Sequence, residues 1–462
     1  MSKDEAKLDP YALAEAYIVA RHTKNPGSGI SCELQLRYWR DEWVLYRDGC
    51  YCRWGLPELK ADIVGYLHGQ QIGINPHYIN SILLALTHLC LIDSRQELNA
   101  WLNEINGANV FVAANGNVSH SDRDPAGKRR LLPHTPWYFT MSRLPYDYNP
   151  AATCPGWLAF LEDVLDGNRE YMRLLQEWCG YLFRPDLREQ KFLLCVGEGA
   201  IGKGVTFEII EALVGRENCS QVSLTRFGNA FGLANTVGKV LNATNESSAF
   251  VEDEAETILK AFVAGDRLTF ERKFKEPIHA VPTAKVMIAT NALPRFTDKT
   301  MGIWRRILLL PFAKTIEEER QSRTLAADII ANELPGILNW GLQGLDQLNQ
   351  QGFTRPEKSR ELLEQYRRDA DPCRDFLCEN FTFSPNAAGE DSGAVYATYR
   401  QFCTANGCQA LNERNFGRQV HRIFPEAERR RTGPRDNRRY IYTGLVGAEE
   451  YAVSHVSQVN PI

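Results

Sequence analysis

Several features that would place this chain in a familiar class are scarce or missing. No apolar run among the 462 residues approaches the length of a membrane-spanning helix, and the first seven residues contain no apolar segment of a signal peptide. The twelve cysteines are scattered. Their closest spacings, Cys50 to Cys52, Cys373 to Cys378 and Cys403 to Cys408, do not form a zinc-binding pattern. We therefore expect a cytoplasmic protein with reduced thiols and no membrane contact.

The chain also lacks a strong charge of either sign. Its formal net charge is −4, with 24% charged and 44% hydrophobic residues. Global attraction to nucleic acid is therefore weak, and any such contact must come from local basic patches. The hydrophobic content is ample for buried cores, and the length indicates roughly three domains.

One stretch has the order of a phosphate-binding loop. An apolar run of strand length, Lys191 to Val196, leads into a glycine-rich turn, and a helical pattern follows from Val205 to Val214. Glycines let successive backbone N–H groups point at phosphate oxygens, and the start of the helix adds partial positive charge. The predicted nucleotide-binding residues are Gly197, Glu198, Gly199, Ala200, Ile201, Gly202, Lys203, Gly204 and Val205.

Lys203 is expected to reach the terminal phosphates of ATP. The next position usually holds Ser or Thr as a ligand of Mg²⁺, but here it is Gly204. Thr206 is a poor substitute, because two helical positions further on it points away from the loop. The alternative interpretation is a glycine-rich turn with a chance lysine.

Two β-prone stretches downstream end in polar residues. Lys239 to Glu246 ends in a carboxylate, and Lys285 to Asn291 ends in an amide. Glu246 is the candidate general base and would also hold Mg²⁺ through water, while Asn291 would sense the γ-phosphate and orient water. Either residue taken alone is better explained as a polar residue at a strand end.

Two further basic elements complete the pattern. A helix ends at Gly265-Asp266, and the alternating stretch after it is a hairpin candidate with Lys273 and Lys275 at its tip. Arg305 and Arg306 precede the apolar strand Ile307 to Pro311, and one of them would neutralise transition-state charge in a neighbouring subunit. The arginines alone could be a surface pair, but the elements together, in this order, indicate a nucleotide-driven machine.

From about Glu189 to Glu379 the chain resembles the phage and plasmid primase-helicase family, which is related to poxvirus nucleoside triphosphatases and belongs to the superfamily 3 helicases. The matching segments are Ile258 to Asp266, Asn291 to Pro294, Asp298 to Arg306, Pro311-Phe312 and Glu333 to Gly344. The resemblance implies an α/β fold with an AAA+-like P-loop ATPase core. It also implies a homohexameric ring that hydrolyses ATP with Mg²⁺ and threads single-stranded DNA through its pore.

Carried over to this chain, the resemblance supports a set of residue roles. They are Lys203 on the phosphates, Glu246 as the Walker B acid, Asn291 as the sensor, Arg305 or Arg306 as the finger, and Lys273 or Lys275 on DNA in the pore.

Residues 8–140 are expected to form a mixed α/β N-terminal domain. This segment resembles the domain that precedes the ATPase in the same family, which implies a role in ring assembly or DNA entry. Leu36 to Trp54 alternates around Asp48-Gly49, a strong hairpin signal, and helical patterns follow at Glu58 to His68 and His77 to Leu89. Its aromatic residues could stack on bases, but hairpin packing is the better explanation for Tyr38, Trp39, Trp43 and Tyr46. No paired carboxylates or zinc cluster appear before residue 150, so priming would need a separate primase or polymerase.

The remaining boundaries follow from composition. We expect a motor at 150–312 with a helical lead-in from Trp157 to Phe183, a helical lid and connector at 313–383, a linker near Ser384 to Gly393, and a polar tail at 447–462. Residues 390–446 are expected to form a C-terminal winged-helix domain that binds duplex DNA. From Arg414 to Arg439 there are nine arginines and three acids, in the order helix, then turned hairpin.

The predicted DNA contacts there are Arg414, Arg418 and Arg422 on one helix face, and Arg429, Arg430, Arg431, Arg438 and Arg439 around the hairpin turn. The alternative is a solvated charged face.

The combined interpretation is a replicative DNA helicase of a phage, plasmid or integrated mobile element, acting in the bacterial cytoplasm. The alternative from another class is an origin-binding or regulatory protein whose nucleotide site gates assembly without processive unwinding. A small-molecule kinase would lack an acceptor site and leave the arginine-rich segment unused.

Overall fold

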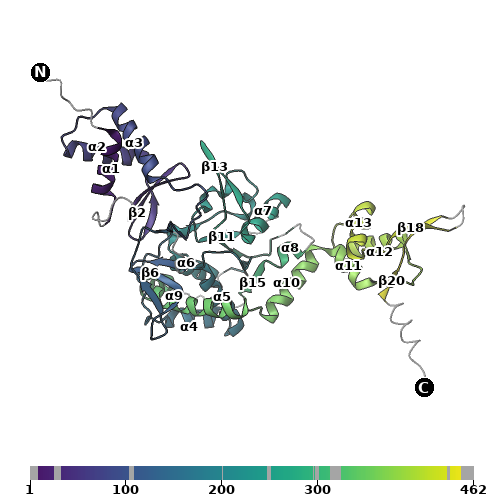
Figure 1. Cartoon of the computed structure of the whole chain (residues 1–462). Helices are drawn as coiled ribbons and strands as arrows, with labels where there is room; N and C mark the ends of the chain where they lie inside the picture. The colour runs from purple at the N-terminus through teal and green to yellow at the C-terminus, as the bar shows by residue number, and fades with distance from the viewer. Residues whose placement is uncertain are drawn as a thin grey trace. The chain divides into compact units, whose positions relative to one another are not determined.

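The computed structural model describes residues 9–24, 33–103, 109–199, 201–246, 251–294, 296, 301–312, 324–433 and 438–448. The chain divides into two compact units, Met1–Ser359 and Arg360–Ile462, which we describe separately (Figure 1). Within the described ranges, no helix combines the length and the apolar character needed to cross a bilayer.

The first unit begins with three helices packed on a small sheet. The helices are α1 Pro10–Arg21, α2 Leu56–Gly69 and α3 Pro76–Cys90. A proline in the first turn of each helix pre-sets the helical φ angle. The two predicted helices of this region are confirmed, whereas α1 was not predicted.

The sheet has the order β1 Leu36–Trp39, β2 Glu42–Arg47, β3 Cys50–Arg53. Asp48 and Gly49 both have positive φ, as a two-residue hairpin turn requires, so the predicted hairpin is confirmed. A second such turn, at Arg40-Asp41, was missed because neither residue is Gly or Asn. Trp39 and Trp43 are buried, which confirms packing as the role of these aromatic side chains.

A second group of strands joins this region to the motor. These strands are β4 Ala100–Trp101, β5 Val110–Ala113, β6 Gly116–Arg123, β7 Arg129–Leu132 and β8 Tyr138–Phe139. Phe111 and Val118 belong to the main hydrophobic core of the motor, and Arg129 Nη2 lies 2.7 Å from Asp346 Oδ1. This strand group therefore packs with the motor, although the expected motor boundary at residue 150 lies downstream of it.

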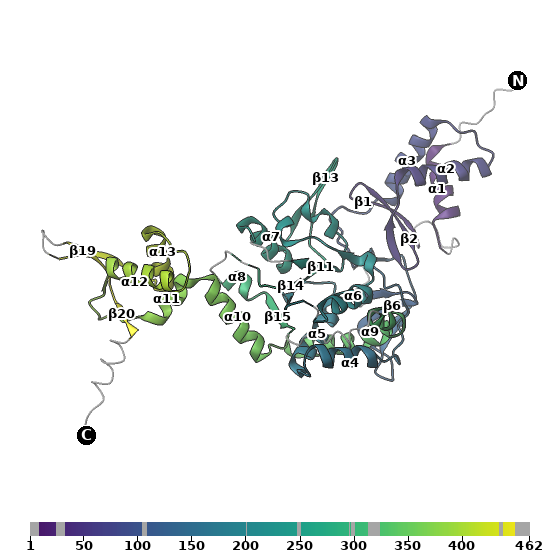
Figure 2. The same cartoon turned by 180° about the vertical axis from the view of Figure 1, so that it is seen from behind.

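The motor is an α/β layer structure. Its helices are α4 Pro155–Val164, α5 Arg169–Leu182, α6 Lys203–Val214, α7 Asp253–Ala264, α8 Met301–Trp304 and α9 Leu325–Gln351, and its strands are β9 Phe192–Val196, β10 Cys219–Ser220, β11 Leu241–Glu246, β12 Leu268–Arg272, β13 Lys275–Ala280, β14 Lys285–Thr290 and β15 Ile307–Pro311. Short 3₁₀ turns lie at Arg216–Asn218, Leu224–Arg226 and Gly232–Thr236. In both views α4, α5 and α9 lie together below the sheet, and the β12–β13 hairpin projects above it (Figures 1 and 2).

The five-stranded sheet is parallel and has the order β10, β11, β14, β9, β15. Val196, Thr290 and Glu246 are register partners across β9, β14 and β11. The strands leading to the glycine loop, to Asn291 and to Glu246 therefore end at one edge of the sheet. In open α/β sheets this carboxyl edge is where ligands bind.

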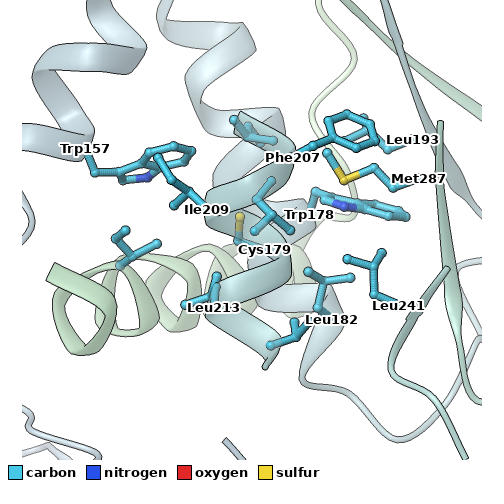
Figure 3. Close-up of a cluster of buried hydrophobic side chains, with 14 of the residues drawn as sticks. Trp157, Trp178, Cys179, Leu182, Leu193, Phe207, Ile209, Leu213, Leu241 and Met287 are labelled. Atoms are coloured by element: carbon cyan, nitrogen blue, oxygen red, sulfur yellow. The ribbon is translucent and has the colours of Figure 1, made fainter. Parts of the chain in front are cut away.

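The core beneath the sheet joins strands and helices. Trp178 of α5, Phe207 of α6, Leu193 of β9 and Met287 of β14 meet in one buried cluster (Figure 3). Helices α5 and α9 approach closely, because a Cβ at Gly180 would lie 2.5 Å from the backbone nitrogen of Leu345. This packing holds the loop and its neighbouring strands in fixed positions.

The second unit has its own core. Its helices after α10 Glu357–Ala370 are α11 Pro372–Asn380, α12 Ser392–Ala405 and α13 Glu413–Ile423, and its strands are β16 Phe381–Phe383, β17 Glu390–Asp391, β18 Arg429–Thr432, β19 Arg439–Tyr442 and β20 Leu445–Gly447. Tyr399 stacks on Phe416 with ring centroids 4.6 Å apart. Phe376, from the expected connector, also belongs to this core, and β16 pairs with β20.

The segment from which we expected a domain linker, Ser384 to Gly393, connects β16 to α12 inside this second unit. The composition of this segment led to the linker prediction. That prediction was wrong because small and polar residues are as common in a tight intradomain loop as in a linker.

Candidate nucleotide and nucleic-acid sites

The glycine-rich loop lies between β9 and α6, as predicted. Gly202 has φ +86°, and a Cβ at this position would lie 2.6 Å from Cγ1 of Val164. Only glycine meets both conditions. Ile201 is buried and anchors the loop, while Glu198, Gly199 and Gly204 are exposed. Ala200 lies outside the described residues.

Helix α6 begins directly at the loop. Its first N–H groups have no carbonyl one turn earlier in the helix to bond, and Gly202, at the cap position, has no side chain to offer them. A helix start with open N–H groups and a positive dipole end is a binding site for phosphate. The residues present therefore fit the phosphates of a nucleotide.

Lys203 connects the loop to the neighbouring strand. Its Nζ donates to the carbonyl oxygens of Gly197 and Thr290 and to Oδ1 of Asn291, the latter two at 2.9 Å. Partial burial lowers the pKa of Lys203 below its ordinary value. The structure thus brings together the predicted phosphate lysine and the predicted sensor, which are 88 positions apart in the sequence.

Glu246 ends the strand on the other side of β14. Its backbone is the register partner of Thr290, two strand spacings, or about 10 Å, from Val196. Its side chain lies outside the described part of the chain. The strand order therefore puts this acid beside Asn291 along the same edge as the loop.

The hydroxyl that usually binds Mg²⁺ has no replacement in this helix. The Thr206 hydroxyl is buried and donates to the Gly202 carbonyl oxygen at 3.0 Å, so it is unavailable to a metal ion. A Cβ on Gly204 would meet no atom within 4 Å, so a larger side chain would fit there. Among the described residues, no three His, Cys, Asp or Glu side chains are grouped to hold a metal ion.

The two predicted finger arginines differ from one another. Arg305 is exposed, whereas Arg306 is 9% exposed and its Nη1 donates to the Gly302 carbonyl oxygen at 2.5 Å. Both precede β15, and the Arg306 carbonyl oxygen accepts from the N–H of Phe192 at the start of β9. They lie at the opposite edge of the sheet from the loop, about 16 Å away along β9. Neither can reach the nucleotide site of its own chain.

Lys273 and Lys275 lie at the tip of the β12–β13 hairpin, as expected. Lys273 is exposed in the two-residue turn. Lys275 begins β13, and its Nζ lies 2.7 Å from Oε1 of Glu42 in the β1–β2 region. Burial acts to raise the pKa of Glu42, but Lys275, Arg53 and Arg272 outweigh this and lower it. The two lysines are therefore not equivalent.

The predicted DNA-binding arginines of the second unit also divide into groups. Arg414 and Arg418 are exposed on α13, whose N-cap is Asn412. Arg422 Nη2 donates to Asp371 Oδ2 at 2.8 Å. Around the hairpin, Arg429 pairs with Glu413 and lies over the Tyr440 ring at 4.7 Å. Arg430 pairs with Glu428. The remaining arginines of the hairpin, Arg431, Arg438 and Arg439, are exposed.

Some participating residues were missed from the sequence. They include Thr290, whose carbonyl oxygen accepts a hydrogen bond from Lys203, and the acids Glu42 and Asp371. Thr290 could have been found, since it immediately precedes the sensor at the same strand end. The two acids carry no local signal, because their partners are distant in the sequence.

The glycine loop and the parallel sheet with its lysine at the carboxyl edge define an α/β nucleotide-binding core. A family model described as a family of unknown function (DUF5906) matches residues 195–306, and the RFX DNA-binding domain model matches residues 376–449. The first covers the loop through Arg306, and the second covers most of the second unit.

Individual relatives match parts of the chain. The chain is 25% identical over 240 residues to "Putative helicase L207/L206" of Acanthamoeba polyphaga mimivirus, covering 45% of this chain and 24% of that protein. It is 38% identical over 53 residues to the DNA-binding protein RFX5 of Homo sapiens, covering 11% of this chain and 9% of RFX5. The match thus spans about a quarter of the viral protein and less than a tenth of RFX5.

A solved structure shares the fold. The apo structure of the NrS-1 C-terminal region (A form) aligns over 94% of this chain and 100% of its own length, with a TM-score of 0.52 and 12% sequence identity. Distant homology to a viral protein described as a putative helicase thus accompanies a fold shared with the NrS-1 region.

The contacts of Lys203 generate the first prediction. Replacing Lys203 by Ala should lower the rate of phosphate release at saturating single-stranded DNA by at least about 100-fold, because the β- and γ-phosphates lose their main counter-cation. Lys128→Ala, at an exposed turn of the same unit, is the matched control. If Lys203→Ala retained most of the activity, the loop would not be part of the active site.

Open space beside Gly204 generates the second prediction. Gly204→Ser supplies a hydroxyl at the usual metal position and should lower the Mg²⁺ concentration for half-maximal phosphate release by roughly 10-fold. Gly204→Ala adds a Cβ without an oxygen and serves as the control. An equal shift in both variants would trace the effect to helix stabilisation instead of metal binding.

Proposed function

We propose that this chain is an ATP-dependent replicative DNA helicase of a phage, plasmid or integrated mobile element, translocating on single-stranded DNA as a homohexameric ring. The observation that carries the proposal is the contact of Lys203 with both Thr290 and Asn291 at the carboxyl edge of the sheet. The distant helicase homology supports the same class.

In this proposal each group at the edge has one task. The loop N–H groups and Lys203 bind the phosphates of ATP. Asn291, already within hydrogen-bond distance of Lys203, orients the attacking water, and Glu246 accepts its proton. Mg²⁺, which supplies charge neutralisation on the phosphates, would be held by the phosphates, by water and by Glu246.

Neither Arg305 nor Arg306 lies at the carboxyl edge of the sheet in its own chain, which supports a ring. Charge developing on the γ-phosphate is commonly neutralised by an arginine supplied in trans. Arg305 is exposed at the far edge of the sheet, whereas Arg306 is buried in its own chain. Arg305 is therefore the proposed finger, acting on the nucleotide of a neighbouring subunit in a head-to-tail ring.

Mixed rings test this arrangement. Arg305→Ala should lower the phosphate release rate by about 10³-fold or more, and Glu246→Gln should bind ATP without hydrolysing it. Mixing the two variants at equal amounts should restore hydrolysis at roughly a quarter of the interfaces, because a functional site needs one subunit of each kind in the correct order. No recovery in verified mixed rings would contradict action in trans.

Arg306→Ala is the comparison variant. Because its side chain is buried, it should lower thermal stability, and mixing should not rescue its defect.

A second candidate function is a nucleotide-gated, origin-binding or regulatory protein without processive unwinding. It is favoured by the RFX-domain match and by exposed Arg414 and Arg418 on α13. The order of α12, α13 and the β18–β19 hairpin supports a winged helix, in which a helix would read the major groove. The two functions differ in speed: a motor has fast DNA-stimulated ATP turnover and separates a forked duplex, and a gate does neither.

Duplex recognition by the second unit is testable separately. The double variant Arg414→Ala, Arg418→Ala should change which duplex sequence is preferred. The double variant Arg431→Ala, Arg439→Ala should weaken binding to all duplexes about equally. It should also reduce the slope of log affinity against log salt by roughly 0.9 per lost phosphate contact. Arg422→Ala, whose guanidinium is bound to Asp371, should mainly lower stability. Competition between origin-derived and random duplexes measures both effects, and unchanged affinity in all variants would leave these arginines as a solvated face.

A further inference from the structure

The tip of the β12–β13 hairpin carries an unusual residue. Phe274, between Lys273 and Lys275, is completely exposed and has φ +60°. A single exposed apolar side chain is ordinary, and needs no explanation. A bulky residue with positive φ is uncommon, because its Cβ crowds the backbone, and Gly or Asn would relieve this strain.

The stem of the hairpin is held both toward its base and near its tip. Phe270 and Ile278 are buried register partners at its base. Nearer the tip, Glu42 accepts from Lys275 at 2.7 Å and lies 3.3 Å from Arg272 Nη1. Figure 1 shows the hairpin projecting from the motor. The stem is therefore anchored while the two turn residues, Lys273 and Phe274, extend into solvent.

An anchored stem presents one cation and one aromatic ring side by side. Consecutive Cα atoms are about 3.8 Å apart, so Lys273 and Phe274 can contact adjacent parts of one extended ligand. A phosphate suits the lysine, and a flat apolar face suits the ring. Single-stranded nucleic acid offers both in every nucleotide, whereas the bases of a duplex are already stacked on one another.

We propose that Phe274 stacks on an unpaired base of single-stranded nucleic acid while Lys273 contacts the adjoining phosphate. This inference rests on the proposed function for its ligand class and adds a base-contacting residue that the lysine-only prediction did not contain. Strain in the turn is retained because Phe274 supplies the stacking surface, and strained residues concentrate at such sites.

The test compares normal and abasic DNA. Fluorescence anisotropy measures binding of an oligothymidylate and of an equally long strand without bases. Phe274→Ala should weaken binding of the oligothymidylate by about 5- to 150-fold, the range for loss of one stacked base. Phe274→Tyr, which keeps a ring, should restore it. On the abasic strand the unmutated protein and Phe274→Ala should bind alike.

Salt dependence separates the two tip residues. Phe274→Ala should leave the slope of log affinity against log salt unchanged, because no counterion is released by a stacked ring, while Lys273→Ala should reduce it by about 0.7. Phe231→Ala is the matched control, since Phe231 is 51% exposed elsewhere in the same unit.

Two binding results would overturn the proposal. The first is unchanged affinity of Phe274→Ala for oligothymidylate, and the second is an equal loss on the abasic strand. Phe274→Gly guards against misfolding: it removes the ring and relieves the positive φ, so it should melt at an unchanged or higher temperature and still bind weakly. A lower melting temperature would make the ring structural. Phosphate release and fork unwinding by the unmutated protein test the proposed function independently of these binding measurements.

Discussion

The parallel pairing of β14 between β9 and β11 brings the residues of the candidate nucleotide site together. It puts the ends of three strands at one level, so that Lys203 reaches the Thr290 carbonyl oxygen and Asn291, with Glu246 one strand further on. The parallel pairing of β15 with β9 puts the start of β15, with Arg305 and Arg306, at the opposite edge. A strand cannot present both its ends at one site. The arginine geometry and the proposed dependence on a neighbouring subunit therefore follow from a single constraint on the sheet.

A second constraint connects the projecting hairpin to the β1–β2 region. Glu42 is contacted by Arg53 from β3 and by Arg272 and Lys275 from the hairpin, so one carboxylate joins two parts of the first unit. Isolated surface ion pairs contribute little, but a carboxylate that is 13% exposed and shared by three cations is a network with restricted geometry. A nucleic-acid phosphate approaching Lys275, which is exposed but paired with Glu42, must compete with that carboxylate, whereas Lys273 and Phe274 lie exposed in the turn. The cations of the hairpin are thus unequal before any ligand binds.

The local sequence pattern predicted most helices and strands, but it did not predict which distant side chains contact one another. The glycine loop, the strands before Glu246 and Asn291, and the helix capped by Asn412 were predictable because each depends on neighbours in the sequence. The turn at Arg40-Asp41 was not, because positive φ there is imposed by the pairing of β1 with β2 and not by residue type. Likewise, Lys275 and Arg422 were predicted as equal members of basic groups, but Glu42 and Asp371 distinguish them through contacts across 233 and 51 positions. Burial of Arg306 beside exposed Arg305 is another nonlocal result.

Because Gly204 has no hydroxyl, the proposed site lacks the side-chain oxygen that usually binds Mg²⁺ at this position. Mg²⁺ retains several waters and is bound in such sites through one or two carboxylates and the substrate phosphates. With Thr206 bonded to Gly202, the helix offers the ion no side-chain oxygen near the loop. The metal would then depend on ATP and Glu246 together, so nucleotide and Mg²⁺ would bind as one unit. Glu246 would serve both as water-mediated metal ligand and as proton acceptor, and these duties oppose one another, because a nearby divalent cation makes a carboxylate a weaker base. In the proposed site Asn291, whose Oδ1 accepts from Lys203 beside that strand end, would orient the water without taking its proton.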